Sequence, residues 1–565
     1  MMVRDTASLG DALRTLSGLL LALPPGPAMA GSAQTDTLRR NLSDQIHDYL
    51  LPRLTHLEAP LLVGIGGSTG AGKSTITNTL TGEHVTDTGV LRPTTRTPVL
   101  VCHPADLAWF MEGGVLPDLP RTTGRPPASG QTLAVRTSSR LRQGLALLDT
   151  PDIDSLEIAN HELAAQLLGA VDLWLFVTTA ARYADAVPWG YLHAARERSI
   201  TLAIAVNRIP LGAAEAVTTH LGEMLTANGL TGVTVFALPE GELVDGRLPA
   251  TAAGTLAWWV DDLAADADRR LEVVRTAIDG AVRSIPARAE QIARGVEGQA
   301  ATVAALAAAA DDRHDDAVAQ VERRLDAGTM LRSEVLERWQ ELVGAGRMMQ
   351  TLQSGVARLR DRLRSLFAGT PSMPAEVHGE LRSALGVAIT EAADAAADAT
   401  VAAWEASDAG RELLGDQGRT LARPTPGLAA AAERHIEAWE DFVLALVSNE
   451  AAGKRMLART VSLGINTVGA ALMVVLFAHT GGLTGGEVVV AGGTATVSQA
   501  LLTAIFGESA VRELARQARN DLVARVQLLL AGEAERFHRL LDGLPTARHA
   551  EALRLAAGDV AAAAR

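Results

Sequence analysis

The chain has 565 residues, which is too long for one compact core, because single domains split beyond about 250 to 300 residues. Hydrophobic residues make up 48% and charged residues 21%, so the chain can form packed cores and is not broadly disordered. The net charge of -14 excludes a surface that binds nucleic acid throughout, since duplex affinity comes mainly from cationic side chains. The one cysteine, Cys102, excludes an internal disulfide and a thiolate metal site, which favours a reducing, cytoplasmic setting.

The first residues include a short apolar stretch. Residues 16–30 follow two arginines and end in small residues, as a secretory signal does, but Pro24 and Pro25 break the apolar run. We therefore expect an amphipathic helix over residues 6–23 that packs on the following domain.

A phosphate-binding loop is the clearest motif in the chain. The apolar run 60–65 predicts a buried strand, which leads into the sequence GSTGAGKS and a helical stretch over residues 75–80. This is the G-x-x-x-x-G-K-S pattern in its strand, loop and helix setting, where glycines let backbone N–H groups converge on a phosphate. Lys73 is expected to bridge the β- and γ-phosphates and Ser74 to bind Mg²⁺. The expected nucleotide contacts are Gly67, Ser68, Thr69, Gly70, Ala71, Gly72, Lys73, Ser74 and Thr75.

A carboxylate on the metal side is expected at the end of another strand. The apolar run 145–148 ends at Asp149, which would hold a water on Mg²⁺. GTPases usually read D-x-x-G here, and the glycine N–H contacts the γ-phosphate, but this chain has Asp152 instead. Since a carboxylate would repel the γ-phosphate, either Asp152 points outward or the loop senses nucleotide differently.

Two segments favour a GTPase over a transporter ATPase. The sequence NTLTG at residues 78–82 looks like the N-x-L-x-G of the large GTPase class that includes translation factors, septins and dynamins. Residues 92–98 resemble the first switch of dynamin-like proteins, in which a threonine reaches Mg²⁺ and the γ-phosphate. Alignment to the T-R-x-P pattern selects Thr95, with Thr94 next.

The resemblance also implies the groups that catalyse hydrolysis. In dynamin relatives, polar residues inside the phosphate loop help to orient the attacking water, and the matching positions here are Thr69 and Gly70. Gly70 has no side chain, so we expect slow turnover that rises when two such domains meet. The residues expected to act in catalysis are Lys73, Thr95, Asp149 and Thr69, and those expected to hold Mg²⁺ are Ser74, Thr95 and Asp149.

The base-reading element departs from the usual pattern. The apolar run 202–206 is followed by Asn207, Arg208, Ile209 and Pro210, where the usual N-K-x-D ends in an Asp that accepts two hydrogen bonds from guanine. Asn207 matches and Arg208 can replace the packing of the lysine, but Pro210 cannot replace the Asp. We still expect GTP, because the other motifs agree in order and spacing, and ATP stays an alternative.

The second half of the chain is predicted to be helical. Apolar residues recur at helical spacing from residue 256 through residues 318–342, 352–367, 381–404 and 429–447, with breaks expected near residues 286, 328, 371–374 and 424–427. A long antiparallel bundle or stalk follows from this pattern.

A membrane hairpin is predicted near the end of this half. Residues 460–486 and 488–507 contain no charged side chain, and each run approaches the roughly 20 residues that cross a bilayer as a helix. Basic residues flank the pair on both sides, which places both outer ends in the cytoplasm. The alternative is a pair of small-residue helices buried in the bundle.

Together these segments resemble bacterial dynamin-like GTPases, particularly the actinobacterial kind. The predicted fold is an α/β P-loop GTPase domain with a mixed, mostly parallel sheet, followed by an all-α stalk and an apolar hairpin. The predicted parts are an N-terminal helical segment (1–58), the GTPase domain (59–250), the stalk (251–453), the hairpin (454–510) and returning C-terminal helices (511–565).

The resemblance implies a function and partners. We expect GTP and Mg²⁺ as ligands, membrane lipid bound through the hairpin at 460–507, self-association through the GTPase domain or stalk, possible pairing with a related GTPase, and no nucleic acid. The expected location is the inner face of the cell membrane. Two alternatives stay open, which are a soluble GTPase switch and an ATP-using NTPase associated with a transporter.

Overall fold

The chain forms two compact units. The computed structural model describes residues 6–86, 97–112, 114–124, 132–152, 158–197, 200–326, 375–451 and 508–565. One unit, the sheet unit, comprises Met1–Gly26, Ala30–Ala300 and Pro545–Arg565, and the other, the helical unit, comprises Pro27–Met29 and Ala301–Leu544. Helix α10 (Ala267–Asp326) contributes residues to both.

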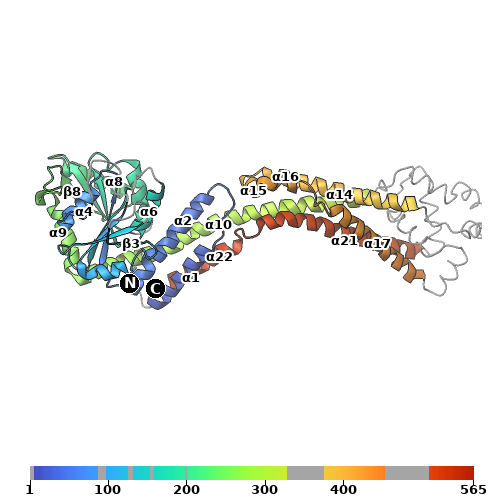
Figure 1. Ribbon diagram of the computed structural model, residues 1–565, viewed down its shortest axis with the longest axis horizontal. Helices are drawn as coiled ribbons and strands as arrows, with labels where there is room; N and C mark the ends of the chain where they lie inside the picture. The colour runs from blue at the N-terminus through green and yellow to red at the C-terminus, as the bar shows by residue number, and fades with distance from the viewer. Residues whose placement is uncertain are drawn as a thin grey trace, which may run out of the picture. The chain divides into compact units, whose positions relative to one another are not determined.

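The sheet unit is built on eight strands in the order β3-β4-β2-β5-β1-β6-β7-β8 (Figure 1). All neighbouring strands are parallel except β2 and β5. The strands are β1 (Leu61–Gly67), β2 (Val99–Cys102), β3 (Arg121–Thr122), β4 (Leu133–Thr137), β5 (Leu145–Asp149), β6 (Leu173–Thr179), β7 (Thr201–Ile209) and β8 (Thr234–Pro239). The central strands β1, β5 and β6 are buried along their whole length, which explains why they read as continuous apolar runs.

The strand order fixes where the site lies. β1 is paired with β5 on one side and β6 on the other, so the carboxyl ends of these parallel strands meet at one edge of the sheet. In open α/β sheets, ligands bind outside the carboxyl ends of the strands, at the point where the connections from a strand lead to opposite sides of the sheet. Here that point is β1, with β5 on one side and β6 on the other. The flanking helices are α4 (Lys73–Thr81), α5 (Leu107–Met111), α6 (Ile158–Gly169), α7 (Ala186–Glu197), α8 (Ala214–Ala227) and α9 (Ala250–Ala265), with a short 3₁₀ turn η2 (Pro104–Asp106) before α5.

The two ends of the chain pack together within the sheet unit. Helix α1 (Thr6–Ala22) packs on α22 (Ala547–Ala563), and the two lie side by side in Figure 1. Four leucines spaced three or four residues apart bury one face of α1, namely Leu9, Leu13, Leu16 and Leu20. The predicted N-terminal helix is thus confirmed. The chain continues through α2 (Ser32–Gln45), the π-helical turn η1 (Ile46–Leu50) and α3 (Leu51–Thr55) into β1.

A buried ion pair joins α3 to the sheet at its opposite edge. The guanidinium of Arg53 contacts the carboxylate of Asp172, and both side chains are fully buried. Asp172 also accepts from the Tyr49 hydroxyl at 3.0 Å and from the Leu62 backbone N–H at 2.7 Å. The charges are therefore paired and hydrogen-bonded, as buried charges need to be.

The helical unit packs around mainly aliphatic side chains, with two tryptophans that also donate hydrogen bonds. Besides α10 it contains α14 (Ala375–Glu405), α15 (Asp408–Leu414), η3 (Gly415–Gln417), α16 (Gly418–Leu421), α17 (Leu428–Ala451) and α21 (Glu508–Leu541). Trp404 and Trp439 are fully buried and donate to the backbone carbonyls of Leu306 and Ala518, at 2.9 and 2.7 Å respectively.

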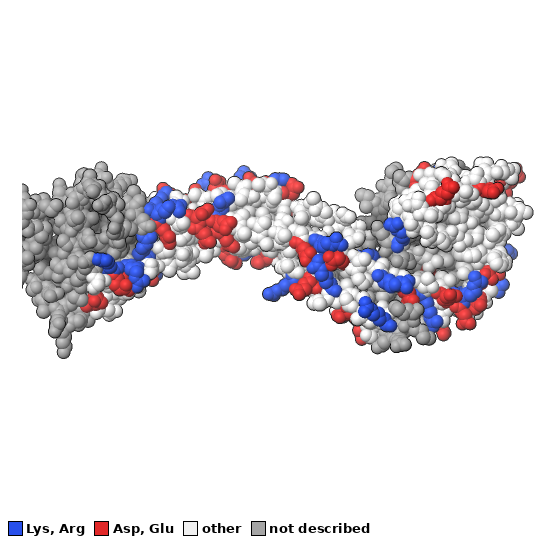
Figure 2. Space-filling view, turned by 180° about the vertical axis from the view of Figure 1, so that it is seen from behind, with Lys and Arg blue, Asp and Glu red and all other residues white. Residues whose placement is uncertain are grey.

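On the face in Figure 2, acidic and basic side chains are mixed along the described helices. Among them, Arg382 pairs with Glu437 and Glu440.

The predicted fold class of an α/β domain with a mixed sheet plus an all-α part is confirmed. Three local expectations are wrong. Helix α10 continues through Pro286, because Ile285 and Ala289 on either side of it are fully buried and their packing outweighs one missing hydrogen bond. The sequence predicts separate helices over residues 511–530 and 533–541, but both belong to one helix, α21, which continues through Gly532. The content of proline, glycine and arginine at 103–139 predicts an irregular insertion, but this segment adds β4 to the sheet next to β2, and β3 next to β4.

The expected hairpin at 460–507 lies outside the described residues. Among the helices that the structure describes, none has the length and apolar character that crossing a bilayer requires.

Replacing Asp172 with Ala is expected to destabilise the sheet unit by about 3 to 5 kcal/mol, because Arg53 would stay buried without its carboxylate. The double variant Arg53→Met with Asp172→Leu is expected to lose less than either single charge deletion, since no lone charge remains. Thermal and urea unfolding of the wild-type chain, Asp172→Ala, Arg53→Met, Asp172→Leu and the double variant measure this. Additive losses in the double variant would contradict the pairing.

Candidate functional site

The loop between β1 and α4 has a backbone that requires glycine. Gly70 and Gly72 adopt positive φ angles of 72° and 101°, and Gly67 has a φ of 155°. A Cβ atom at Gly67 would lie 2.0 Å from the Val177 carbonyl oxygen, and one at Gly72 would lie 2.4 Å from the side-chain nitrogen of Asn207. No side chain fits at either position without displacing the loop. The predicted phosphate-loop residues are thus assembled into one tight turn at the start of α4.

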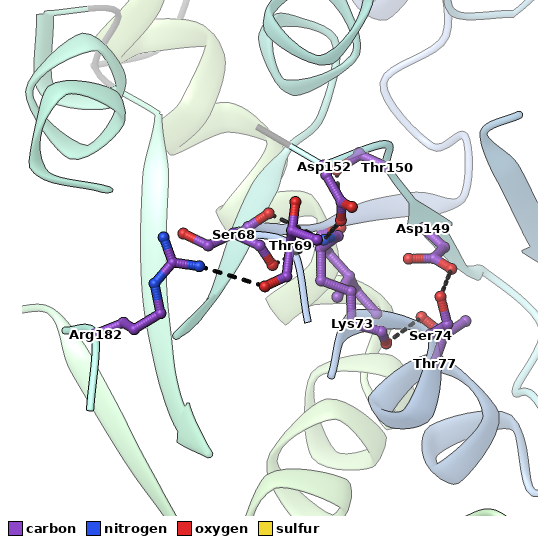
Figure 3. A network of polar contacts seen from close by, with 11 residues as sticks. Ser68, Thr69, Lys73, Ser74, Thr77, Asp149, Thr150, Asp152 and Arg182 are labelled. Atoms are coloured by element: carbon purple, nitrogen blue, oxygen red, sulfur yellow. Dashed lines mark hydrogen bonds and ion pairs between the residues drawn. The ribbon is translucent and has the colours of Figure 1, made fainter. Parts of the chain in front are cut away.

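The Lys73 side chain curls back beneath this loop (Figure 3). It is 4% exposed, and its Nζ donates to the carbonyl oxygens of Gly67 at 3.0 Å and Ser68 at 3.2 Å. It also forms an ion pair with Asp152. Asp152 therefore points into the site, which excludes the first of the two alternatives drawn from the sequence and leaves the second, a loop that senses nucleotide differently.

Ser74 and Asp149 meet beside Lys73. The Ser74 hydroxyl donates to Oδ2 of Asp149 at 2.8 Å, while Oδ1 of the same carboxylate is buried and has no hydrogen-bond partner among the described residues. Burial raises the pKa of Asp149 to about 6, against the opposing effects of the Lys73 ammonium and the Ser74 hydroxyl. The structure thus brings together two of the three predicted metal ligands, and Thr95 lies outside the described residues.

These groups fit a magnesium ion that shares its ligands with a phosphate. Mg²⁺ commonly takes one or two carboxylates and fills its other positions with water and substrate phosphate oxygens. Within the described part of the chain, no three His, Cys, Asp or Glu side chains gather to hold a metal by themselves. One carboxylate with an unsatisfied oxygen and an adjacent hydroxyl match the shared arrangement.

Asn207 links the end of β7 to the phosphate loop. Its side-chain amide donates to the Ala71 carbonyl at 2.9 Å, and its Oδ1 accepts from the Arg208 backbone N–H at 2.9 Å. Arg208 is exposed and has a φ of 53°, a strained value for a residue with a side chain. Asn207 therefore contacts the loop, whereas Arg208 and Pro210 are exposed at the same edge of the sheet.

One cation beside the loop was not identified from the sequence. Arg182 follows β6, and its guanidinium is 3.4 Å from the Thr69 carbonyl oxygen in a weak contact, while it pairs with Asp185 at 3.0 Å (Figure 3). The signal that could have found it is the apolar run of β6, whose carboxyl end had to lie next to the end of β1 in a parallel sheet. Thr69 itself is half-buried.

Solved structures similar to this chain include bacterial dynamins. An oligomerised bacterial dynamin pair, described as providing a mechanism for the long-range sensing and tethering of membranes, is 10% identical, with 98% of this chain and 94% of that chain covered and a TM-score of 0.38. LeoA, a bacterial dynamin GTPase from ETEC, is 12% identical, with 99% and 98% covered and a TM-score of 0.23. Era in complex with MgGDPNP and part of 16S ribosomal RNA is 21% identical, with 33% and 59% covered and a TM-score of 0.22.

No family model and no curated protein matches the chain. Bacterial dynamins are thus among the structural neighbours, as the sequence motifs led us to expect, and nothing distinguishes an actinobacterial subtype. The TM-scores of these structures are 0.38 and below, and the activity is therefore inferred from the residues of the site.

Replacing Asp149 with Asn is expected to stabilise the chain in EDTA at neutral pH. Because the folded-state pKa is raised to about 6, the protonated carboxyl contributes stability at pH 4 that is lost as the pH rises through 6. The gain in the free energy of unfolding of Asp149→Asn should be about 3 kcal/mol above pH 7 and become smaller towards pH 4.5. Thermal unfolding of both proteins at the two pH values measures it, and an equal gain at both would contradict the burial argument.

Proposed function

We propose that this chain is a dynamin-like GTPase that binds GTP with Mg²⁺, hydrolyses it and couples the nucleotide state to self-association at a membrane. One observation carries the nucleotide part of the proposal. Lys73 is buried under a glycine-shaped loop at the start of α4, with the Ser74 hydroxyl and the Asp149 carboxylate beside it.

The residues of the loop have distinct parts in this proposal. Backbone N–H groups at the start of α4, with the helix dipole behind them, would bind the β-phosphate. The Lys73 ammonium would bridge the β- and γ-phosphates. Ser74 and Asp149 would hold magnesium, with Thr95 as the expected third ligand, and the bound ion supplies positive charge that neutralises the phosphate oxygens.

Hydrolysis requires an oriented water and further positive charge. Thr69 in the loop is the candidate that positions the water, and Lys73 supplies charge on the phosphate side. Arg182, next to the Thr69 carbonyl, adds a second cation at this edge. Electrostatic groups of this kind supply most of the catalysis in phosphoryl transfer.

GTP is proposed over ATP because the phosphate loop, the NTLTG segment, residues 92–98 and Asp149 follow the order and spacing of GTPases. The hydrogen bond from the Asn207 amide to the Ala71 carbonyl supports its assignment to the base-reading element. Proposed membrane association rests on the uncharged runs at 460–486 and 488–507 and their basic flanks, and places the protein at the inner face of the cell membrane. Self-association through the sheet unit or the helical unit is proposed as the step that speeds turnover.

The test compares GTP and ATP affinity, with Mg²⁺, for the full chain and for Lys73→Ala. We expect preference for GTP and a loss of at least 100-fold in the variant, because the buried ammonium is the phosphate ligand. Lys454→Ala is the matched control, since Lys73 and Lys454 are the two lysines of the sequence. Absence of nucleotide binding by the full chain would refute the proposal. Equal affinities for GTP and ATP would indicate an NTPase without base preference.

The same preparations test the membrane and assembly parts. Sedimentation with anionic liposomes and GTP turnover per molecule at rising protein concentration are measured. We expect lipid-dependent sedimentation and increasing turnover. A chain that stays in the supernatant and has constant specific activity is a soluble GTPase switch.

A further inference from the structure

Asp152 uses a hydrogen-bond donor that a nucleotide would need. Its side chain is almost completely buried, and one carboxylate oxygen is paired with the Lys73 ammonium. The other oxygen, Oδ2, is also buried and has no hydrogen-bond partner among the described residues. Asp152 therefore lies inside the site, where only one of its two carboxylate oxygens has a hydrogen-bond partner among the described residues.

The donors of Lys73 are all engaged. An ammonium group has three N–H donors, and here they meet the carbonyl oxygens of Gly67 and Ser68 and the carboxylate of Asp152. The two carbonyls belong to the loop that would hold the β-phosphate. The Asp152 carboxylate is therefore the acceptor that a γ-phosphate would have to replace.

The charge balance strengthens this competition. Two buried carboxylates, Asp149 and Asp152, lie near one ammonium group, and Asp152 adds to the raised pKa of Asp149 by its negative charge. A γ-phosphate brought beside an ionised Asp152 would meet a like charge in a poorly solvated site. A diphosphate has no γ-phosphate and does not require the carboxylate to leave.

We propose that Asp152 determines the specificity between nucleoside diphosphate and triphosphate. It does so by accepting the third N–H donor of the Lys73 ammonium, which a γ-phosphate requires. This inference rests on the proposed function. The chain then binds the diphosphate in its resting arrangement, and triphosphate binding is coupled to expulsion of Asp152 from Lys73. Residues 149–152, where the usual D-x-x-G would stand, then respond to the γ-phosphate through charge repulsion instead of through a glycine N–H.

The test measures Mg²⁺-dependent affinities for GDP and for a non-hydrolysable GTP analogue in the full chain, Asp152→Asn and Asp152→Gly. We expect the wild-type chain to prefer GDP and both variants to gain at least tenfold more affinity for the triphosphate than for GDP. Asp261→Asn is the control, because this exposed carboxylate on α9 pairs with Arg142 and contacts no residue of the site. It should leave the ratio of the two affinities unchanged.

An unchanged ratio in both Asp152 variants, with binding intact, would overturn the inference and leave the proposed function standing. An equal change in Asp261→Asn would also overturn it, because the loss of any acidic side chain would then suffice. Failure of the wild-type chain to bind either nucleotide would refute the proposed function itself. Thermal unfolding verifies that each variant is folded.

An independent observation concerns the base. Strands β7 and β8 pair with Ile209 opposite Pro239, and the Glu240 backbone N–H donates to the Ile209 carbonyl at 2.8 Å. The next residues on the two strands, Pro210 and Glu240, are thus neighbours at the carboxyl edge of the sheet, and both are exposed. The sheet therefore places Glu240 next to Pro210, the position that the usual N-K-x-D pattern fills with Asp.

Guanine presents an N1–H and an exocyclic N2–H₂ group, which one carboxylate can accept together, whereas adenine presents no such pair. Because Pro210 cannot accept them, we infer that Glu240 supplies the carboxylate that selects guanine. This inference also rests on the proposed function, and it concerns the base and not the phosphates.

Glu240→Gln is expected to lower GTP affinity at least tenfold, to leave ATP affinity unchanged and to raise affinity for xanthosine triphosphate. The last effect follows because the new amide can donate to the C2 carbonyl of xanthine. The matched control is Glu242→Gln, an exposed carboxylate two residues further on, which should behave as wild type. If Glu240→Gln keeps the wild-type ratio of GTP to ATP affinity, the assignment is wrong, whereas a wild-type chain that binds no GTP refutes the proposed function.

Discussion

A buried ammonium group organises the candidate site. Lys73 starts α4, yet its side chain turns back under the preceding loop, where two carbonyl oxygens and the Asp152 carboxylate surround it. An isolated cation could not be buried at this depth, because its desolvation would cost several kcal/mol. The loop conformation, the start of the helix and the segment after β5 therefore depend on one another through a single charge.

The order of the strands makes this convergence possible. Asp149, the phosphate loop, Arg182 and Asn207 are separated by long stretches of sequence, yet each follows or ends one of four neighbouring strands, β5, β1, β6 and β7. Since these strands are parallel, every functional group leaves the sheet at the same edge. The paired and buried Arg53 and Asp172 lie at the opposite edge, so structural and functional charges are kept apart.

The parts of the site that could be predicted are those with a local signal. Glycine spacing identified the loop, and apolar runs ending in Asp149 and Asn207 identified two strands correctly. The direction of Asp152 was not predictable in this way, because it depends on an ammonium group 79 positions earlier in the chain. β3 and β4 were missed because short strands in an insertion acquire their structure from their neighbours, β4 from pairing with β2 and β3 from pairing with β4. Helix α10 passes Pro286 because tertiary packing outweighs the local preference. The apolar run around Cys102 predicts an inert core thiol, and the thiol is indeed buried, which raises its pKa to about 12.

The burial of Lys73 also has a chemical consequence. The chain carries 51 basic side chains, of which Lys73 and Lys454 are lysines and the rest are arginines. Reagents that acylate primary amines therefore have few targets, and the ammonium that is paired with Asp152 and shielded by the loop should be acylated slowly. Mass spectrometry of acylated peptides containing residue 73 would then report how often this loop opens to solvent.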